Sequence, residues 1–455
     1  MNERTIAAIS TAQGQGGIGI IRISGTEAID IADKIFVSVS GKKLSELEGY
    51  RASYGKVQEN GEMLDEAVAI VYRAPYSYTG ENIVEICCHG GLFVTREILR
   101  AVIQAGAVTA EPGEFTKRAF LNGKMNLSEA QAVMDIISAQ SKQAARTALS
   151  LRTGALSNKI YDIRNQLVSV AGHLAAWADY PEEDIPEVSY ESLADRILNA
   201  KNVINKLIKE YSAGQAILHG VDTVIAGRPN VGKSTLMNLL SGFQKSIVTD
   251  IPGTTRDLVE ETVIVGDVTL RLCDTAGIRE TDNIVEKIGV DRTKDRLSSC
   301  ALVLAVFDSS EELDEEDIKL IDSLSDIPAI AIINKSDLEN KIDIEYIEKK
   351  IKNIVRISAK TGDGKDELEA AIAEVSGTKN FDPCSGILSS ERQRAAALNA
   401  LYALDDAQNT LDAGFSFDAI TVCIEDAIEA LLQLTGENVA DAVVDDVFHS
   451  FCVGK

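Results

Sequence analysis

The chain has 455 residues, a formal net charge of −25 at pH 7, 45% hydrophobic residues and 25% charged residues. This length predicts roughly three domains, and the composition is typical of a globular chain with enough apolar residues for a large core. The excess of acidic residues argues against a protein that coats nucleic acid, because lysine and arginine drive phosphate binding. A local basic patch would still suffice for RNA.

Targeting signals and cysteine usage predict the compartment. No run approaches the roughly 18 apolar residues of a membrane span. The first residues, Met-Asn-Glu-Arg-Thr, lack the basic and apolar regions of a secretory signal. Seven cysteines without C-x-x-C spacing fit free thiols in a reducing environment. We therefore expect a cytoplasmic protein that makes no membrane contact.

Residues 5–9 and 20–23 read as strands on either side of a glycine cluster that matches G-x-G-x-x-G. A dinucleotide-binding fingerprint has to open a helix. This cluster opens the sequence Ile-Ile-Arg-Ile, a strand, so we reject that interpretation. Arg22 inside the strand is either an edge-facing charge or a ligand for an anion.

The following residues alternate between helical and extended patterns, which predicts a small α+β domain over residues 1–119. We expect helices over residues 26–35 and 92–105 and strands near 52–57, 65–72 and 82–88. His89 precedes two glycines and is more typical of a turn than of a catalytic base. The four histidines have no metal-ligand spacing, so no transition metal is predicted.

Helical character begins near Phe120 and returns over residues 388–449, on both sides of a different pattern. An acidic, proline-containing segment at 179–186 interrupts the first helical part. The helix after it is expected to end near Tyr211, with Ala213 and Gly214 marking the entry to the next domain. The predicted limits are 120–215 for the first helical part, 216–378 for an inserted domain and 379–455 for the second helical part.

The inserted domain opens with an apolar strand that stops at Gly227 and is followed by Gly232, Lys233 and Ser234, the spacing G-x-x-x-x-G-K-[ST] of a phosphate-binding loop. Glycines let backbone N–H groups ring a phosphate without a Cβ in the way. Lys233 adds charge near the outer phosphates, and the Ser234 hydroxyl suits Mg²⁺. The apolar pattern that follows predicts a helix whose N-terminus points at the anion.

Four further polar segments follow the P-loop, and together they predict a Ras-like P-loop GTPase. Asp337 can accept two hydrogen bonds from the guanine edge that adenine does not offer. The predicted nucleotide-binding residues are Asn230, Val231, Gly232, Lys233, Ser234, Thr235, Thr249, Asp250, Ile251, Pro252, Gly253, Thr254, Thr255, Asp274, Thr275, Ala276, Gly277, Asn334, Lys335, Asp337, Ser358, Ala359 and Lys360. Ile278 stands where many GTPases carry the glutamine that orients the attacking water. Another group must therefore orient it here.

The motifs resemble those of the tRNA-modification GTPase family MnmE, also called TrmE. The resemblance rests on the P-loop Gly-Arg-Pro-Asn-Val-Gly-Lys-Ser, the switch Thr-Asp-Ile-Pro-Gly-Thr-Thr-Arg-Asp, Ile278, the stretch Phe-Leu-Asn-Gly-Lys and the terminal Phe-Cys-Val-Gly-Lys. It covers essentially the whole chain. It implies a multidomain α/β protein with an N-terminal folate-binding and dimerising domain, a helical domain and an inserted GTPase domain. The family often has Pro-Pro-Gly before the glycine cluster, where this chain has Ala12, Gln13 and Gly14.

The resemblance also implies ligands. A tetrahydrofolate derivative, 5-formyl or 5,10-methylene, is expected near Arg22, Glu85, Lys124 and Lys455. Mg²⁺ is expected on Ser234 and Thr255, and K⁺ on oxygens of Asn230, Thr249, Ile251 and Thr254, in place of an arginine finger. Glu286 is expected to orient the attacking water through a second water.

Family members form homodimers and work with a flavin- and NADH-using partner, MnmG, as a heterotetramer. Together they add an aminomethyl or carboxymethylaminomethyl group at C5 of the wobble uridine of tRNA. Cys452 is expected to be needed for this modification, although from chemistry alone a terminal cysteine is more often a bystander. Lys455 at the last place argues against a prenylation signal. The rival interpretation is a regulatory GTPase of ribosome assembly, which would have no use for a folate domain or for Cys452.

Overall fold

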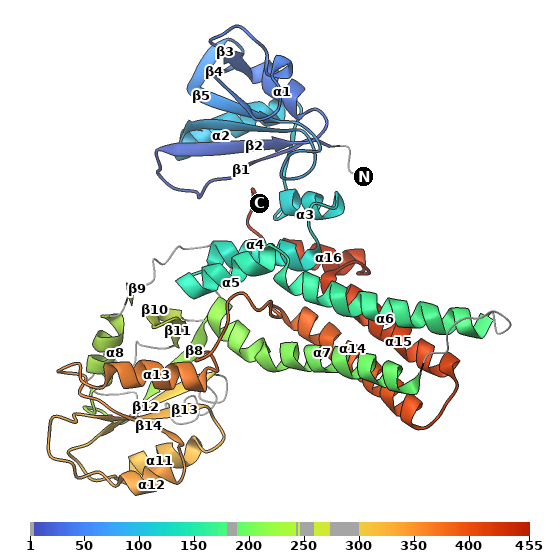
Figure 1. Ribbon diagram of the computed structural model, residues 1–455. Helices are drawn as coiled ribbons and strands as arrows, with labels where there is room; N and C mark the ends of the chain where they lie inside the picture. The colour runs from blue at the N-terminus through green and yellow to red at the C-terminus, as the bar shows by residue number, and fades with distance from the viewer. Residues whose placement is uncertain (1–3, 180–188, 243, 246–258, 274–299) are drawn as a thin grey trace. The chain divides into compact units, whose positions relative to one another are not determined.

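The computed structural model describes residues 4–179, 189–242, 244–245, 259–273 and 300–455 (Figure 1). The chain divides into two compact units. The first comprises Met1–Met134 together with Thr435–Lys455, and the second comprises Asp135–Leu434. The predicted domain limits stay a prediction, since these units divide the chain at other places.

The first unit is built on a seven-stranded sheet with the order β3-β4-β5-β6-β2-β1-β7. Its strands are β1 (Ile6–Ile9), β2 (Ile18–Ser24), β3 (Phe36–Ser38), β4 (Arg51–Glu59), β5 (Glu62–Tyr72), β6 (Ile83–His89) and β7 (Val108–Thr109). The pairs are antiparallel except for β1 with β7. The glycine cluster does lead into the strand β2, so the prediction of a strand there is confirmed.

Helices α1 (Ala28–Ile35) and α2 (Leu92–Gln104) share one apolar core with the sheet. Ile21 and Ile23 of β2 are fully buried in that core. Because side chains alternate along a strand, Arg22 between them lies on the opposite face of the sheet. The same alternation along β6 places Glu85 on that face, beside Arg22 in the register.

The C-terminal residues belong to this first unit. The unit also contains the 3₁₀ helix η1 (Leu44–Glu46) and the helices α3 (Glu114–Leu121), most of α4 (Leu127–Ser138) and α16 (Asp441–His449). Phe448 and Phe451 are buried in an apolar cluster with Ala119 of α3 and Leu127 of α4. Because of this packing, the terminal residues Cys452 to Lys455 lie within the first unit.

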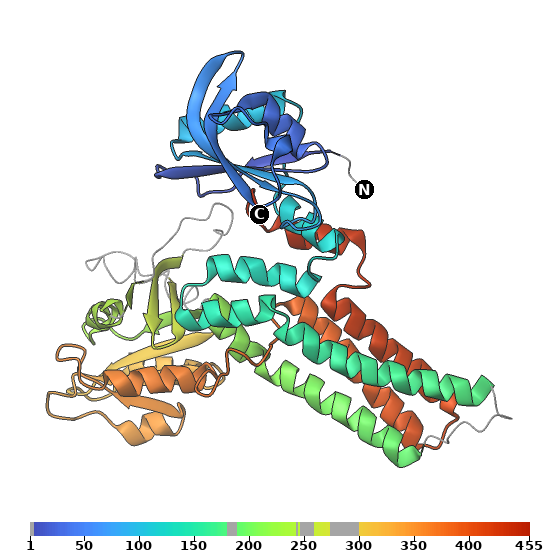
Figure 2. The ribbon, with the colours of Figure 1, turned by 45° about the horizontal axis from the view of Figure 1, so that its top comes forward.

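The second unit contains the long helices α5 (Lys142–Arg152), α6 (Ala155–Asp179), α7 (Tyr190–His219), α14 (Glu391–Asp412) and α15 (Phe417–Thr435). Helices α6, α7, α14 and α15 run side by side in both views (Figures 1 and 2). Their apolar residues recur at helical spacing, which lets each helix bury one face. The predicted acidic break at 179–186 lies almost entirely outside the described residues.

Helix α7 is longer than expected, because the sequence predicted its end near Tyr211 and the entry to the next domain at Ala213 and Gly214. The helix continues to His219, and Gly220 in the left-handed region (φ +80°) ends it. Gly214 is needed for close packing instead, because a Cβ there would collide with Cδ1 of Ile387. A glycine in a helical pattern can thus mark a packing contact as well as an end.

The predicted inserted domain, in the second unit, is built on a seven-stranded sheet with the order β14-β13-β12-β8-β11-β10-β9. Its strands are β8 (Val221–Ala226), β9 (Gln244–Lys245), β10 (Val259–Val265), β11 (Val268–Cys273), β12 (Leu302–Asp308), β13 (Ala329–Asn334) and β14 (Asn353–Arg356). The five strands β14, β13, β12, β8 and β11 pair in parallel. Helices α8 (Lys233–Ser241) and α13 (Lys365–Val375) share one core with the sheet, and α11 (Glu315–Ser323) and α12 (Ile344–Glu348) share the other.

This layering explains where a site can form. Strands β12 and β13 are fully buried along their lengths, as strands covered on both faces must be. Ligands of such open sheets bind at the carboxyl ends of the parallel strands. Over the part of the chain that the structure describes, no helix is both long and apolar enough to cross a membrane.

Candidate functional site

The P-loop connects β8 to α8 through a backbone that requires glycine. Gly227 and Gly232 have φ of +147° and +101°, values that side chains rarely allow. A Cβ on Gly227 would collide with the carbonyl oxygen of Val306, and one on Gly232 with the side-chain amide of Asn334. The loop is therefore seated against the ends of β12 and β13.

The N-terminus of α8 is suited to an anion. Its first residue is Lys233, and its N-cap, Gly232, has no side chain that could bond the first backbone N–H groups. Those N–H groups and the helix dipole favour negative charge at this end. Ser234 is exposed and Thr235 half-buried in the same first turn. The backbone and the residue types fit a phosphate with its Mg²⁺.

The ammonium group of Lys233 donates hydrogen bonds to two backbone carbonyl groups of the phosphate loop. It donates to the carbonyl oxygens of Gly227 at 2.7 Å and Arg228 at 2.6 Å. Burial lowers the pKa of Lys233. A partly desolvated cation at this place has a strong field for phosphate oxygens.

The loop after β13 forms the second half of the site. The Asn334 side chain donates to the carbonyl oxygen of Val231 at 2.8 Å and accepts from the N–H of Ala359 at 3.0 Å. Asn334 is 2% exposed, so both bonds are sheltered from water. The P-loop, the Asn-Lys-Ser-Asp loop and the Ser-Ala-Lys segment are thus joined through one side chain.

Asp337 is presented to solvent with a fixed orientation. The Ser358 hydroxyl donates to its Oδ1 at 2.7 Å. This bond lowers the pKa of Asp337, helped by the charge of Lys360. The ionised carboxylate is the acceptor that a guanine N1–H and 2-amino group need.

Sequence reasoning missed Asp308, at the end of β12. Its carboxylate pairs with the ammonium of Lys335 and accepts from the hydroxyl and N–H of Ser310. Burial opposes ionisation, but these hydrogen bonds hold the pKa of Asp308 below its usual value. An acidic residue at the carboxyl end of an apolar strand, next to the Asn-Lys-Ser-Asp strand, was the available signal.

Several predicted residues cannot be compared with the structure. Those that lie outside the described residues are Thr249, Asp250, Ile251, Pro252, Gly253, Thr254, Thr255, Asp274, Thr275, Ala276, Gly277, Ile278 and Glu286. Of the proposed Mg²⁺ and K⁺ ligands, Ser234 and Asn230 are described, and Asn230 has a φ of +65°. The described residues contain no group of three or more histidine, cysteine or acidic side chains arranged for a metal.

A second cluster of predicted residues lies in the first unit. The Arg22 guanidinium pairs with Glu85 at 2.7 Å, and the Tyr72 hydroxyl donates to the same carboxylate at 3.2 Å. The guanidinium also lies over the rings of Tyr78 and Phe115, 5.6 Å from each centroid. Strand β2 lies between β6 and β1, which argues against the interpretation of Arg22 as an edge-facing charge, and its role as an anion ligand stays a prediction.

The chain's last residues join this cluster. The carbonyl oxygen of Gly454 accepts from the Ser10 hydroxyl at 3.0 Å and from Arg22 at 3.4 Å. Lys455 lies close to Arg22 and Glu85. Burial and the Arg22 charge lower the pKa of Lys455, and the Glu85 charge raises it. The cluster therefore contains one carboxylate and two cations on one face of the sheet.

Two other predicted residues have separate surroundings. Lys124 is exposed and donates to the carbonyl oxygen of Pro75 at 3.1 Å. Cys452 is half-buried, and its carbonyl oxygen accepts from the N–H of Gly113 at 3.3 Å. The six cysteines whose side chains the structure describes are free thiols, as expected.

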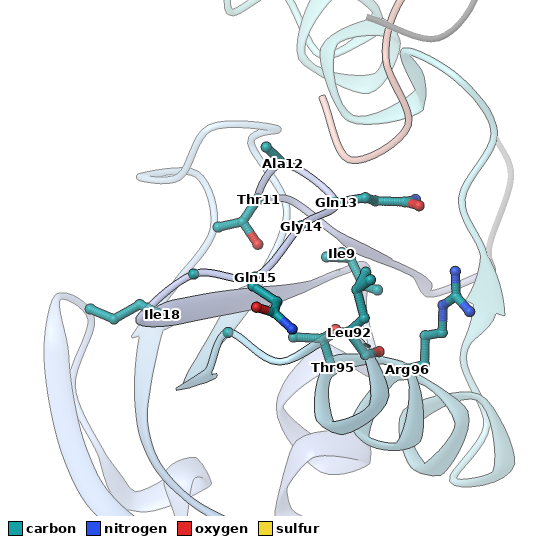
Figure 3. Close-up of a pocket in the computed structure, with 12 residues that line it drawn as sticks. Ile9, Thr11, Ala12, Gln13, Gly14, Gln15, Ile18, Leu92, Thr95 and Arg96 are labelled. Carbon is teal, nitrogen blue, oxygen red and sulfur yellow. Dashed lines mark hydrogen bonds between the residues drawn. The ribbon is translucent and has the colours of Figure 1, made fainter. Parts of the chain in front are cut away.

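A cavity of about 260 Å³ lies elsewhere in the first unit (Figure 3). The glycine-rich loop around Gln13 and Gln15 forms one side, and Leu92, Thr95 and Arg96 of α2 form another. None of the four residues predicted for folate lines it. We assign it no role in the proposed chemistry.

The phosphate loop and the guanine-reading loop, joined through Asn334, define a P-loop GTPase domain. Comparison with known proteins agrees across the chain. Family models match residues 5–124, described as "GTP-binding protein TrmE N-terminus", and residues 127–452, described as "MnmE helical domain". The chain belongs to the MnmE (TrmE) family.

The relatives cover the chain end to end. The tRNA modification GTPase MnmE of Clostridioides difficile is 41% identical over 456 residues, covering 99% of each chain. That of Acetivibrio thermocellus is 42% identical over 459 residues, covering 100% of this chain and 99% of its own. Among solved structures, the G domain of the T. maritima FeoB iron transporter is 28% identical over 34% of this chain and 98% of its own, with a TM-score of 0.26.

Proposed function

We propose that this chain hydrolyses GTP and that hydrolysis serves the modification of the wobble uridine of tRNA. The observation that supports it most is the Asn334 link, which joins the phosphate loop to a loop whose Asp337 carboxylate is ionised and exposed. In such a site the guanine-binding loop and the phosphate loop are held in a fixed relative position. Membership of a family whose relatives are tRNA modification GTPases supports the tRNA part.

At the phosphates, Lys233 and the N–H groups of α8 bind the outer oxygens. Ser234 and Thr255 hold Mg²⁺, which when bound neutralises charge on the β- and γ-phosphates. The N–H of Gly277 is the proposed donor to the γ-phosphate.

The water and the transition-state charge need other groups, because Ile278 is apolar. In our proposal Glu286 orients the attacking water through a second water. Oxygens of Asn230, Thr249, Ile251 and Thr254 hold K⁺, which when bound supplies positive charge where other GTPases use arginine. Turnover then requires K⁺ and the approach of two GTPase domains in a homodimer.

This part is tested by turnover in K⁺ and Na⁺ over a range of protein concentration. We expect faster hydrolysis in K⁺ and a rate per protein that rises as dimers form. Glu286→Ala should slow hydrolysis and leave GTP affinity nearly intact, since its role lies in the transition state. Equal turnover in both salts would remove K⁺ from the account.

The first unit is proposed to bind a tetrahydrofolate derivative, 5-formyl or 5,10-methylene, and to dimerise. The residues fit this ligand: Glu85 offers a carboxylate for a pterin N–H pair, and Arg22 and Lys455 offer cations for a glutamate tail. Lys124 would reach the ligand from the loop at Pro75. A tetrahydrofolate held by these residues would supply a one-carbon unit.

Heat unfolding with and without 5-formyl-tetrahydrofolate tests this site. The ligand should raise the unfolding temperature of the wild type, because binding to the folded state alone stabilises it. Glu85→Gln should weaken the shift. Glu97→Gln on α2, where Glu97 pairs only with Arg100 in the described contacts, is the matched control and should keep it.

The remaining proposals follow from family membership. The chain works in the cytoplasm with the flavin-dependent MnmG as a heterotetramer. The product carries an aminomethyl or carboxymethylaminomethyl group at C5 of the uridine, and Cys452 takes part in forming it. We propose the division into residues 1–119, 120–215, 216–378 and 379–455 as functional domains.

A further inference from the structure

Arg228 stands at an unspecified position of the motif G-x-x-x-x-G-K-[ST], and its side chain forms ion pairs with three carboxylates. Its Nη1 donates a hydrogen bond to Asp314 at 2.6 Å and its Nη2 donates one to Glu311 at 3.2 Å. Its Nε lies 2.9 Å from Asp317 in an ion pair that lacks hydrogen-bond geometry. The Arg228 side chain is 17% exposed and the Asp317 side chain 2%. A guanidinium shared by three carboxylates is a fixed anchor, since its planar fork allows several directed contacts at once.

The carboxylates are themselves fixed by the start of α11. Asp314 is the N-cap, and its Oδ1 accepts from the N–H groups of Glu316 and Asp317. Asp317 completes a capping box by accepting from the N–H of Asp314. Asp314 therefore uses one oxygen for the helix and the other for Arg228.

Apart from Arg228, the Asp317 carboxylate contacts few groups that could stabilise its negative charge. Its Oδ1 is buried and has no hydrogen-bond partner, and burial raises the pKa of this carboxyl. A buried carboxylate in that position needs its cation. This contact holds Arg228 against α11 rather than leaving it to solvent.

The backbone of Arg228 connects this anchor to the phosphate site. Its carbonyl oxygen accepts from the Lys233 ammonium at 2.6 Å, and the neighbouring carbonyl of Gly227 accepts at 2.7 Å. Gly227 is pressed against Val306 of β12. The two carbonyls that orient Lys233 are thus fixed by β12 on one side and by α11 on the other.

We infer that Arg228 is a positioning residue of the nucleotide site, which holds the carbonyl groups that aim Lys233 at the outer phosphates. The inference rests on the proposed GTPase function and deepens it. Arg228 need not touch the nucleotide for this role. Its loss should weaken binding of the outer phosphates in GTP and GDP alike, a loss of uniform binding.

Arg228→Met tests the inference, since methionine keeps the apolar stem and removes the charge. We expect KM for GTP and Kd for GDP to rise about tenfold, the size expected for loss of a charged hydrogen bond, while kcat changes less. Arg228→Lys should restore part of the affinity through its single charge. Lys350→Gln breaks another ion pair of α11, with Asp322, away from the phosphate loop, and should leave both constants unchanged.

A second variant separates positioning from stability. Arg228→Met leaves Asp317 buried and unpaired, which destabilises the fold, whereas Arg228→Met with Asp317→Asn removes that charge. The positioning role predicts that the double variant regains the unfolding temperature but keeps the raised Kd for GDP. A Kd within about twofold of the wild type in the double variant would overturn the inference.

The same measurements distinguish this inference from the proposed function. If the wild type fails to hydrolyse GTP, the proposed function fails, and the GDP affinities of the variants still decide the role of Arg228. If the wild type hydrolyses GTP and Arg228→Met matches it in KM and in Kd for GDP, the positioning role alone is wrong.

Discussion

Asn334 donates a hydrogen bond of 2.8 Å to the carbonyl oxygen of Val231, which connects the loop after β13 to the phosphate loop. The two residues are 103 positions apart in the chain. The bond fixes the distance between the place where a base is read and the place where phosphates are held. The site can therefore recognise a nucleotide as a whole.

Asn334→Ala should weaken both nucleotide affinity and the fold. It removes the donor to Val231 and leaves the buried N–H of Ala359 without its acceptor, a loss of about 1–3 kcal/mol in the free energy of unfolding. A fluorescent GDP titration and urea unfolding of the same preparation measure the two effects. Asn409→Ala, on the exposed face of α14, is the control. Wild-type affinity in Asn334→Ala would show that the link is dispensable.

Asp337→Asn should exchange the base that the site accepts. Asparagine presents an amide in place of the second acceptor, so GTP binding should fall and xanthosine triphosphate should bind better. Competition of each triphosphate against labelled GDP measures the change. Asp343→Asn is the control, because asparagine caps α12 as well as aspartate does. An unchanged preference for GTP would contradict the role of Asp337.

Cys452→Ser should separate the two activities. Cys452 lies in the first unit and the phosphate loop in the second, so we expect near-wild-type GTP hydrolysis with loss of the modified uridine in cells. GTP turnover and mass spectrometry of tRNA nucleosides report the two effects. Cys384→Ser, at an exposed cysteine of the second unit, should change neither. Normal uridine modification in Cys452→Ser would make this cysteine a bystander, and lost hydrolysis would make the terminal residues structural.

Asp135→Asn should stabilise the protein more at high pH than at low pH. Asp135 is 8% exposed, its Oδ2 has no hydrogen-bond partner, and burial raises its pKa from 3.8 to about 7. Between those values the folded state retains a proton that the unfolded state has lost, so stability falls as the pH rises. The full penalty, reached above pH 7, is ~4 kcal/mol at about 1.4 kcal/mol per pKa unit.

Thermal unfolding at pH 8 and pH 5 checks this prediction. The midpoint should rise in Asp135→Asn at both values, with the larger gain at pH 8. Asp426→Asn, at an exposed aspartate of α15, should show no such difference. An equal rise in the midpoint at both pH values would mean that Asp135 is not protonated in the folded protein at pH 5.

Much of the GTPase domain could be predicted from the sequence, because each motif follows a strand. The apolar runs of β8 and β13 end directly at the Gly227 loop and at Asn334. The spacing of glycines and polar residues then defines the chemistry of each loop. The strand after the glycine cluster at 14–19 was also predictable, because Ile-Ile-Arg-Ile is rich in β-branched residues.

Other features depend on contacts between distant residues, which local patterns do not report. Gly214 was mistaken for the entry to the next domain because its packing partner, Ile387, lies far along the chain. The ion pairs of Arg228 with Asp314 and Asp317 and the pair of Lys335 with Asp308 form only when neighbouring strand ends meet. The proximity of Lys455 to Arg22 depends on the packing of Phe448 and Phe451, which lie just before Lys455 in the chain.

The most direct test of the account is nucleoside mass spectrometry of tRNA from a strain that lacks this gene. We expect loss of the uridine that carries an aminomethyl or carboxymethylaminomethyl group at C5. The wild-type gene should restore it, and Asp337→Asn should fail to do so at cellular GTP. The same level of modified uridine with and without the gene would contradict the account and favour a GTPase that acts as a switch without modification chemistry.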